Sequence, residues 1–190
     1  MDGILTELNP INGEVLNSFN SDTYRCGQSS LVVENKIVVC GIQGTELTNC
    51  LDLSSKQVMW SYNNGGHSSI PMISNGKVYQ CTDYMVRCLE LNSGKLIWEN
   101  HEEISYISSP IILNKMIVVS GRGFINIYDS ENGNLLHQLK TEAGVSIGAI
   151  ISENNILYFG DKFGLFYAFK INQSDNKIGK TKIESKELWN

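Results

Sequence analysis

A pattern of short strands and tight turns recurs about every forty residues along this chain, and it constrains the fold more than any other feature. The best copy is Gly76–Trp98, in which Lys77–Cys81 and Val86–Leu91 alternate between apolar and polar residues. Asn92-Ser93-Gly94 interrupts this alternation before Lys95–Trp98 resumes it. Three short strands joined by turns predict an antiparallel meander.

One turn position sets the register of the repeat, because glycine adopts the positive φ of a tight turn without strain. The equivalent positions are Gly13, Lys56, Gly94 and Gly133, which are separated by 43, 38 and 39 residues. A fifth copy is stretched by a polar segment at 172–182, after which the chain repeats the outgoing strand. A period of this length, made only of strands and turns, is typical of the blades of a β-propeller.

We therefore predict an all-β fold, namely a β-propeller of four-stranded antiparallel blades in an incomplete ring. Residues 1–190 form a single propeller segment with about four and a half blades. The predicted units are a half-blade at 3–19 and four blades at 29–62, 69–99, 109–139 and 147–189. No long apolar stripe of helical period occurs in the sequence, which argues against helices in the core.

The charge of the chain bears on its partners and its location. The formal net charge is −5, and the 15 basic residues are scattered rather than gathered in a stripe, so we predict no nucleic-acid partner. The sequence contains no run of 18 apolar residues, so it predicts no membrane span. Its first ten residues do not resemble a secretory signal. As written, the chain is predicted to be cytoplasmic; if it is a fragment, it is periplasmic or secreted.

The five cysteines follow the repeat. Cys40 and Cys81 occupy one equivalent position, and Cys50 and Cys88 occupy another, as small buried residues do. The odd number and the absence of a CxxC spacing argue against zinc and against a disulfide framework. Cys81 and Cys88 are expected to face each other across a hairpin, where the geometry suits a disulfide poorly. We interpret all five as thiols in a reducing compartment.

The residues of these strands resemble the repeat of the PQQ-like (quinoprotein-type) β-propeller family, and the resemblance covers essentially the whole chain. It is carried by Val78-Tyr79 on the second strand of a blade, by Cys88-Leu89-Glu90 on the third, and by Ser93-Gly94-Lys95 with Trp98 on the fourth. The resemblance implies that this tryptophan lies between adjacent blades near the turn glycine. The predicted blade-docking residues are Trp60, Trp98 and Trp189, while Asn17 and His137 replace the tryptophan in the other copies.

The family contains quinone-dependent dehydrogenases and also members that bind no cofactor. The resemblance implies that a dehydrogenase would use a pair of adjacent cysteines stacked on the quinone, a bound calcium and an aspartate base. This sequence has no adjacent cysteine pair, so we predict no catalytic residue, no cofactor and no metal site. The alternative is a fragment of a quinoprotein-like dehydrogenase, or a regulatory propeller attached to an enzyme.

The leading hypothesis is a non-catalytic scaffold that binds a protein or peptide through its loops. In a four-stranded blade, the loops after the second and fourth strands emerge on one face, and here those loops are rich in aromatic residues and arginine. Such residues on a rigid scaffold are typical of a protein-binding surface. The candidate residues of this face are Tyr24, Arg25, His67, Asp83, Tyr84, Tyr106, Arg122, Phe124, Lys162 and Phe163.

The two ends of the chain are not expected to complete a ring together. The N-terminal half-blade supplies only third and fourth strands, whereas the last blade has all four. Apolar side chains at the two ends should then be partly uncovered, among them Ile4, Leu8, Leu165 and Phe169. We therefore predict self-association, or further blades in a longer chain.

Overall fold

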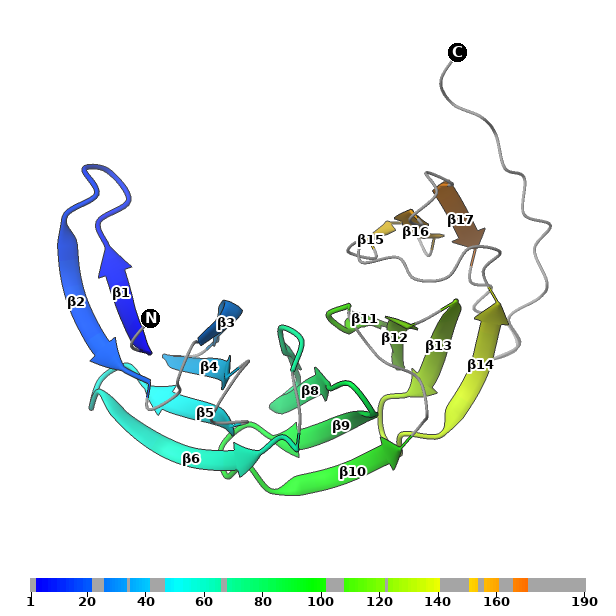
Figure 1. Ribbon diagram of the computed structural model, residues 1–190, viewed down its shortest axis with the longest axis horizontal. Helices are drawn as coiled ribbons and strands as arrows, with labels where there is room; N and C mark the ends of the chain where they lie inside the picture. Colours follow the sequence, from blue (N-terminus) through cyan, green and yellow to red (C-terminus); the bar gives the residue numbers. More distant parts are fainter. Residues whose placement is uncertain are drawn as a thin grey trace, which may run out of the picture.

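The computed structural model confirms the predicted all-β fold class. The part of the chain that it describes contains strands and turns but no helix (Figure 1). A two-stranded hairpin and four sheets follow one another along an arc, and the ring is not closed (Figure 1). The described residues are 3–21, 26–33, 35–41, 47–65, 68–101, 108–121, 123–140, 151–153, 156–160 and 166–170.

Every sheet pairs its strands antiparallel in chain order. The hairpin, which we call the half-blade, consists of β1 (Ile4–Leu8) and β2 (Val15–Asn20). The strands of blades 1 and 2 are β3 (Cys26–Val33), β4 (Lys36–Gly41), β5 (Leu47–Asp52), β6 (Gln57–Asn63), β7 (Met72–Ser74), β8 (Lys77–Cys81), β9 (Met85–Glu90) and β10 (Leu96–His101). Those of blades 3 and 4 are β11 (Ile111–Leu113), β12 (Met116–Gly121), β13 (Phe124–Asp129), β14 (Leu135–Lys140), β15 (Ile151–Glu153), β16 (Ile156–Gly160) and β17 (Phe166–Lys170). The expected outer strand of blade 4 lies outside the described residues.

The inner strands of blades 2 and 3 are shorter than the sequence suggested. β7 and β11 have three residues each, and they begin just after Pro71 and Pro110. Proline has no N–H to donate to a sheet ladder, so it stays at the start of a strand. Upstream of Pro71, Ser69 donates its backbone N–H to the Cys81 carbonyl, 2.9 Å away.

The core is divided into apolar clusters that lie between neighbouring blades. The cluster between blades 1 and 2 contains Val38, Cys50 and Trp60 from one side and Val78, Leu89 and Leu91 from the other. Equivalent clusters join blades 2 and 3 and blades 3 and 4. Blades are therefore held together face to face, so each blade depends on its neighbours for burial.

The last of these clusters corrects one expectation about the ends of the chain. Phe169 was expected to be partly uncovered, but it is only 7% exposed. Its ring stacks on Phe159 with 5.3 Å between centroids, and both belong to the cluster shared with blade 3. Blade 3 covers this face of blade 4, which the sequence argument did not consider. At the other end, Ile4 and Leu8 are 58% and 53% exposed, and Leu165 lies outside the described residues.

A tryptophan from blade 1 packs on the turn glycine of blade 2. The Trp60 ring is so close to Gly94 that a Cβ added there would lie 2.6 Å from it. The indole N–H of Trp60 donates to the Leu91 carbonyl, 2.8 Å away. Glycine at this turn therefore has two roles, since it takes a φ of +69° and it leaves room for the ring.

The same contact recurs one blade later, between Trp98 and Gly133. A Cβ on Gly133 would clash with the Trp98 ring, and the indole N–H donates to the Ser130 carbonyl at 3.0 Å. The half-blade departs from this pattern. Its Asn17 accepts a hydrogen bond from Lys56 Nζ at 3.0 Å, and Lys56 holds the glycine position with a φ of +59°. At these three junctions, tryptophan and turn glycine therefore occur together, and they are replaced together.

The described cysteines Cys50, Cys81 and Cys88 are buried free thiols. The expectation that Cys81 and Cys88 face each other is wrong, because the register pairs Cys81 with Val86 and Cys88 with Tyr79. Burial raises the pKa of Cys50 to about 11 and that of Cys88 to about 12. It also raises the pKa of Cys81 above its usual range. At neutral pH these thiols are protonated core groups rather than nucleophiles.

Candidate functional site

The β8–β9 and β12–β13 turns and the ends of β6 and β10 lie at one end of the blades, because successive strands run antiparallel. We call this end the loop face. The opposite end carries the turns between first and second strands and between third and fourth strands. Among the predicted binding residues, Asp83, Tyr84 and Phe124 lie in described parts of this face.

Three of the ten predicted binding residues are described by the structure. Tyr84 lies at the β8–β9 turn and is 62% exposed, whereas Asp83 beside it is half-buried. Phe124 is half-buried and begins β13, where it pairs with Gly121 across the equivalent turn of the next blade. The others lie outside the described residues, as does the third predicted docking tryptophan: Tyr24, Arg25, His67, Tyr106, Arg122, Lys162, Phe163 and Trp189.

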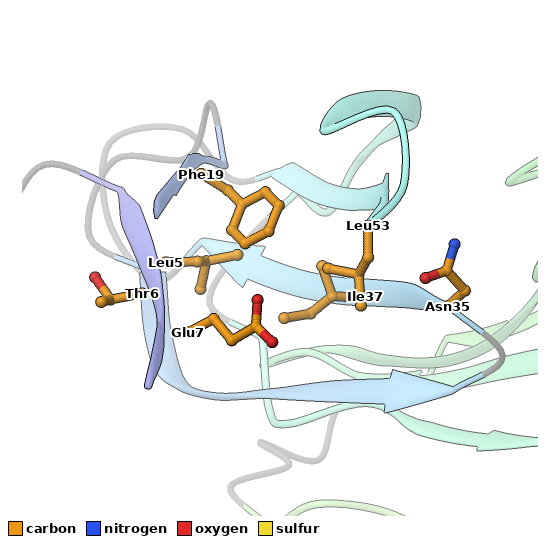
Figure 2. Close-up of a pocket in the computed structure, with 7 residues that line it drawn as sticks. All are labelled: Leu5, Thr6, Glu7, Phe19, Asn35, Ile37 and Leu53. Atoms are coloured by element: carbon orange, nitrogen blue, oxygen red, sulfur yellow. The ribbon is translucent and has the colours of Figure 1, made fainter. Parts of the chain in front are cut away.

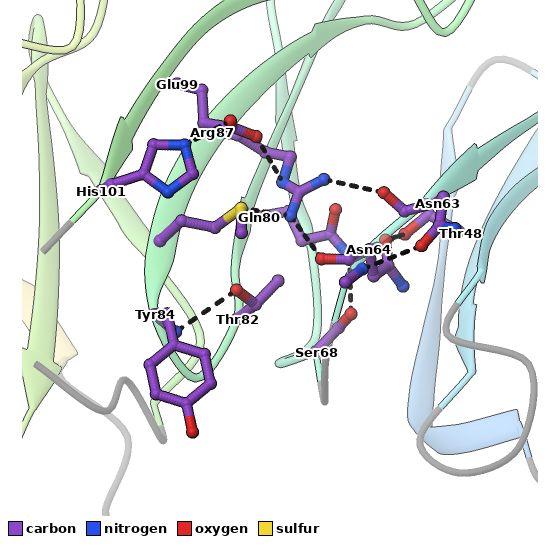
Figure 3. Close-up of polar contacts among 12 residues, drawn as sticks. Thr48, Asn63, Asn64, Ser68, Gln80, Thr82, Tyr84, Arg87, Glu99 and His101 are labelled. Atoms are coloured by element: carbon purple, nitrogen blue, oxygen red, sulfur yellow. Dashed lines mark hydrogen bonds and ion pairs between the residues drawn. The ribbon is translucent and has the colours of Figure 1, made fainter. Parts of the chain in front are cut away.

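The turn that carries Tyr84 is held by main-chain bonds. Thr82 donates its N–H to the Met85 carbonyl at 2.8 Å, and Thr82 also forms a bridge to Ser68. Tyr84 lies two residues after Thr82, and the backbone N–H of Tyr84 lies 3.5 Å from the Thr82 hydroxyl oxygen (Figure 3). The phenol therefore projects from a fixed turn, and its exposure does not come from a loose loop.

Beneath this turn, a buried polar network joins blade 2 to blade 1 (Figure 3). Gln80 Nε2 donates to Thr48 Oγ1 at 2.6 Å and to Ser68 Oγ at 2.7 Å. Thr48 in turn donates to Asn64 Oδ1 at 2.6 Å. Gln80, Thr48 and Asn64 are all at most 1% exposed, so these bonds fix the relative position of the two blades in an environment with little water.

Arg87 is the largest buried side chain of this network, and its side chain is 2% exposed. Its guanidinium donates to the carbonyls of Asn63 and Asn64, at 3.2 and 2.7 Å. It lies over the Tyr62 ring, 5.0 Å from the centroid. Arg87 therefore fixes the chain that leaves β6 on the loop face, using donors that fan out from one planar group.

A charged pair continues from Arg87 to the surface. Glu99 lies directly opposite Arg87 in the sheet, with 3.7 Å between Oε2 and the arginine Nε. The other oxygen of Glu99 lies 2.7 Å from His101 Nε2. The buried cation is thus balanced by a carboxylate that reaches the edge of the loop face.

The sequence analysis did not predict this network, although the repeat contains a pattern that indicates it. Arg87 occupies the repeat position that Asn49 and Asn126 hold in blades 1 and 3, as the strand pairings show. All three side chains are polar and at most 1% exposed. A polar residue recurring at one interior strand position predicts a buried polar layer, because such groups need partners.

A recess of about 540 Å³ lies between the half-blade and blade 1 (Figure 2). It is lined by Leu5, Thr6, Glu7, Phe19, Asn35, Ile37 and Leu53. Its volume suits a small molecule. Between complete blades this space is filled. Val78 of blade 2 is equivalent to Ile37, and it packs against Val38 from the second strand of blade 1. The recess is therefore the space that inner strands of the half-blade would fill.

In the part of the chain that the structure describes, no three His, Cys, Asp or Glu side chains come together as a metal site requires. No described helix is long and apolar enough to cross a membrane.

Four-stranded antiparallel blades, joined by indoles that rest on turn glycines, define this protein as a β-propeller of the PQQ-like type. The family model of the outer membrane protein assembly factor BamB matches residues 1–187, and the chain belongs to this family. This confirms the resemblance found in the repeat. No curated protein sequence matches the chain.

Solved structures agree on the fold. BamB from Moraxella catarrhalis has a TM-score of 0.74 and 16% identity, and the match covers 88% of this chain and 56% of that one. The computationally designed protein Ika4 has a TM-score of 0.65 and 17% identity over 75% of this chain and 89% of its own. A europium-containing methanol dehydrogenase has a TM-score of 0.64 and 16% identity over 78% and 41%. The chain thus spans 56% of the Moraxella protein, and these similarities concern the fold.

Proposed function

We propose that this chain is a non-catalytic propeller scaffold that binds a protein or peptide through its loop face. The observation that carries the proposal is Tyr84, a tyrosine 62% exposed at the tip of a turn that lies directly on the Arg87 and Gln80 network. Tyrosine offers a large apolar ring with a polar tip, and it is among the residues that most often dominate binding energy.

The rigidity of the platform supports this function. Ordering a mobile loop costs free energy on binding, and a turn already fixed by hydrogen bonds avoids most of that cost. Thr82 and Ser68 fix the turn on one side, and the buried hydrogen bonds of Arg87 fix the neighbouring segment at Asn63. A partner would thus meet a surface whose shape is set before it arrives.

Family membership supports the same class of function. The name of the matched family describes an assembly factor, and a scaffold that contacts other proteins is the corresponding role for this chain. We place no nucleic acid among its partners, because the chain is acidic, with a net charge of −5. The buried free thiols support a reducing compartment such as the cytoplasm, and a periplasmic location follows if the chain is a segment of an exported protein.

Replacing Tyr84, Tyr106 and Arg122 together by Ala is expected to abolish partner capture in a pull-down. The melting temperature should stay nearly unchanged, because Tyr84 is exposed and the other two belong by sequence to loops of the same face. Binding to the captured protein would be quantified by titration, and stability by thermal denaturation.

A matched control comes from the outer rim of the propeller. Ile97 lies at a bulge in β10 and is 44% exposed, so Ile97→Ser removes an exposed apolar side chain away from the loop face. This variant should bind as the wild type does. Undiminished binding by the triple variant would refute the proposal. A bound chromophore that appears on adding quinone and calcium would favour the enzymatic alternative instead.

A further inference from the structure

The junction between the half-blade and blade 1 is built differently from the next junction along the arc. Between blades 1 and 2, the Trp60 indole packs on Gly94 and donates its N–H to the Leu91 carbonyl at 2.8 Å. At the half-blade, the strand pairings put Asn17 in the tryptophan position, and Lys56 holds the glycine position. The half-blade therefore lacks the indole that joins blade 1 to blade 2.

The blade 1 turn that faces the half-blade otherwise matches the turn at Gly94. The backbone N–H of Lys56 donates to the Asp52 carbonyl at 2.9 Å. The N–H of Gly94 makes the equivalent bond, and both residues have a positive φ, of +59° and +69°. Leu53 precedes Lys56 by three residues, so its carbonyl corresponds to the indole acceptor Leu91. The turn has the form that receives an indole, but Lys56 puts a side chain where the ring would lie.

Polar contacts take the place of the indole at this junction. The Lys56 ammonium donates to Asn17 Oδ1 at 3.0 Å and lies 5.7 Å from the centroid of the Phe19 ring. A buried hydrogen bond also joins Asn49 Nδ2 to the Ser21 carbonyl at 2.7 Å. An exposed cation near a ring stabilises an interface less than an aromatic ring buried between two sheets.

Apolar packing at this junction is sparse as well. Of the described residues in its apolar cluster, Leu5 alone belongs to the half-blade. The other members come from blade 1, namely Ile37, Leu51, Leu53 and Val58. Between blades 1 and 2, by contrast, each side supplies several buried apolar side chains. The recess of about 540 Å³ lies in the same interface (Figure 2). Because docking strength follows the apolar area buried, the half-blade is held less tightly than blades 1 and 2 hold each other.

We propose that the half-blade is a strap that opens from blade 1 at the Lys56 junction, while blades 1, 2 and 3 stay joined by their indoles. A hairpin of two strands is only marginally stable in water by itself, so the β1–β2 ladder should separate when the strap opens. Opening uncovers Ile37 and Leu51, which are at most 8% exposed in the closed form. The strap thus controls access to an apolar face of blade 1. Tyr84 belongs to blade 2, so this proposal does not depend on the proposed function.

Native-state hydrogen exchange of the 190-residue chain tests the proposal. Hydrogen-bonded amides of β1 and β2 should exchange together, about tenfold or more faster than those of β8 and β9. The latter strands belong to blade 2, which indoles join to both neighbours. Asn17→Trp and Lys56→Gly, made together, restore the indole and the open turn beside the Leu53 carbonyl. This pair should slow the β1 and β2 amides about tenfold or more and leave β8 and β9 unchanged.

The two single variants are the matched controls. Asn17→Trp leaves the Lys56 side chain where the ring must lie, whereas Lys56→Gly clears the turn but removes the cation from Asn17. Neither should slow exchange in the half-blade, so the effect of the pair should exceed the sum of the two single effects. Thermal denaturation shows whether each variant is folded.

Wild-type β1 and β2 amides that exchange as slowly as those of β8 and β9 would overturn the proposal. This comparison requires no variant, so it decides the question even if the double variant does not fold. A folded double variant whose half-blade exchanges as fast as the wild type would also overturn it. So would a single variant that slows exchange as much as the pair, since the indole and the open turn would then not act together.

Discussion

Trp98→Ala is expected to lower the free energy of unfolding by about 3–5 kcal/mol. The Trp98 side chain is 8% exposed and packs in a cluster with Tyr79, Ile117 and Tyr128, so its removal leaves a cavity between blades 2 and 3. It also leaves the Ser130 carbonyl without its indole donor. Urea denaturation at equilibrium measures the loss. Because the ring joins two blades, the transition should shift as a whole.

Two variants separate packing from the hydrogen bond. Trp98→Phe keeps an aromatic ring but removes the N–H, so it should cost less than the alanine variant, with about 1 kcal/mol from the lost bond. Ile97→Ala, at a neighbouring side chain that is 44% exposed, should change stability by about 0.5 kcal/mol or less. If Trp98→Ala unfolded at the same urea concentration as the wild type, the indole would not be a docking element.

Arg87→Ala is expected to cost about 3–5 kcal/mol, which is typical of breaking a buried charged contact. The arginine is 1% exposed, and its loss strips the buried Asn64 carbonyl of a 2.7 Å donor. It also removes the cation opposite Glu99 and the contact with the Tyr62 ring. The same urea experiment measures the effect.

Matched substitutions test the reason for this loss. Arg87→Lys keeps the charge but cannot donate to the carbonyls of both Asn63 and Asn64 from one planar group, so it should recover only part of the stability. Lys77→Ala removes an ion pair to Glu131 whose carboxylate side chain is 63% exposed, and it should cost about 1 kcal/mol or less. Equal effects of Arg87→Ala and Lys77→Ala would show that burial is not what makes Arg87 important.

The sequence predicted those parts of the fold that each repeat carries within itself. Strand alternation and the turn at Gly94 are local, and they were sufficient to place the ends of β8, β9 and β10 within three residues. The docking position of Trp98 came from the family resemblance rather than from the pattern alone. The partners of a side chain were harder to predict, because they belong to the next blade. Phe169 is buried for that reason, since blade 3 covers it.

The candidate site was only partly predictable for the same reason. An exposed tyrosine in a loop can be found from the turn pattern, as Tyr84 was. The polar network beneath it depends on which strands of blades 1 and 2 face each other, so Gln80 and Thr48 meet across 32 residues of sequence. Nothing local in either strand specifies that contact. Comparing polar residues at equivalent repeat positions would have found Arg87.

Hydrogen exchange of the chain, alone and in complex with the protein that it captures, tests the central claim most directly. If the loop face is the binding surface, amides at 82–85 and 64–65 should become protected in the complex. Amides of the outer strands β6, β10 and β14 should exchange as before, because they lie on the rim. Protection confined to the rim or to the half-blade, with the turn at Tyr84 unchanged, would contradict the account.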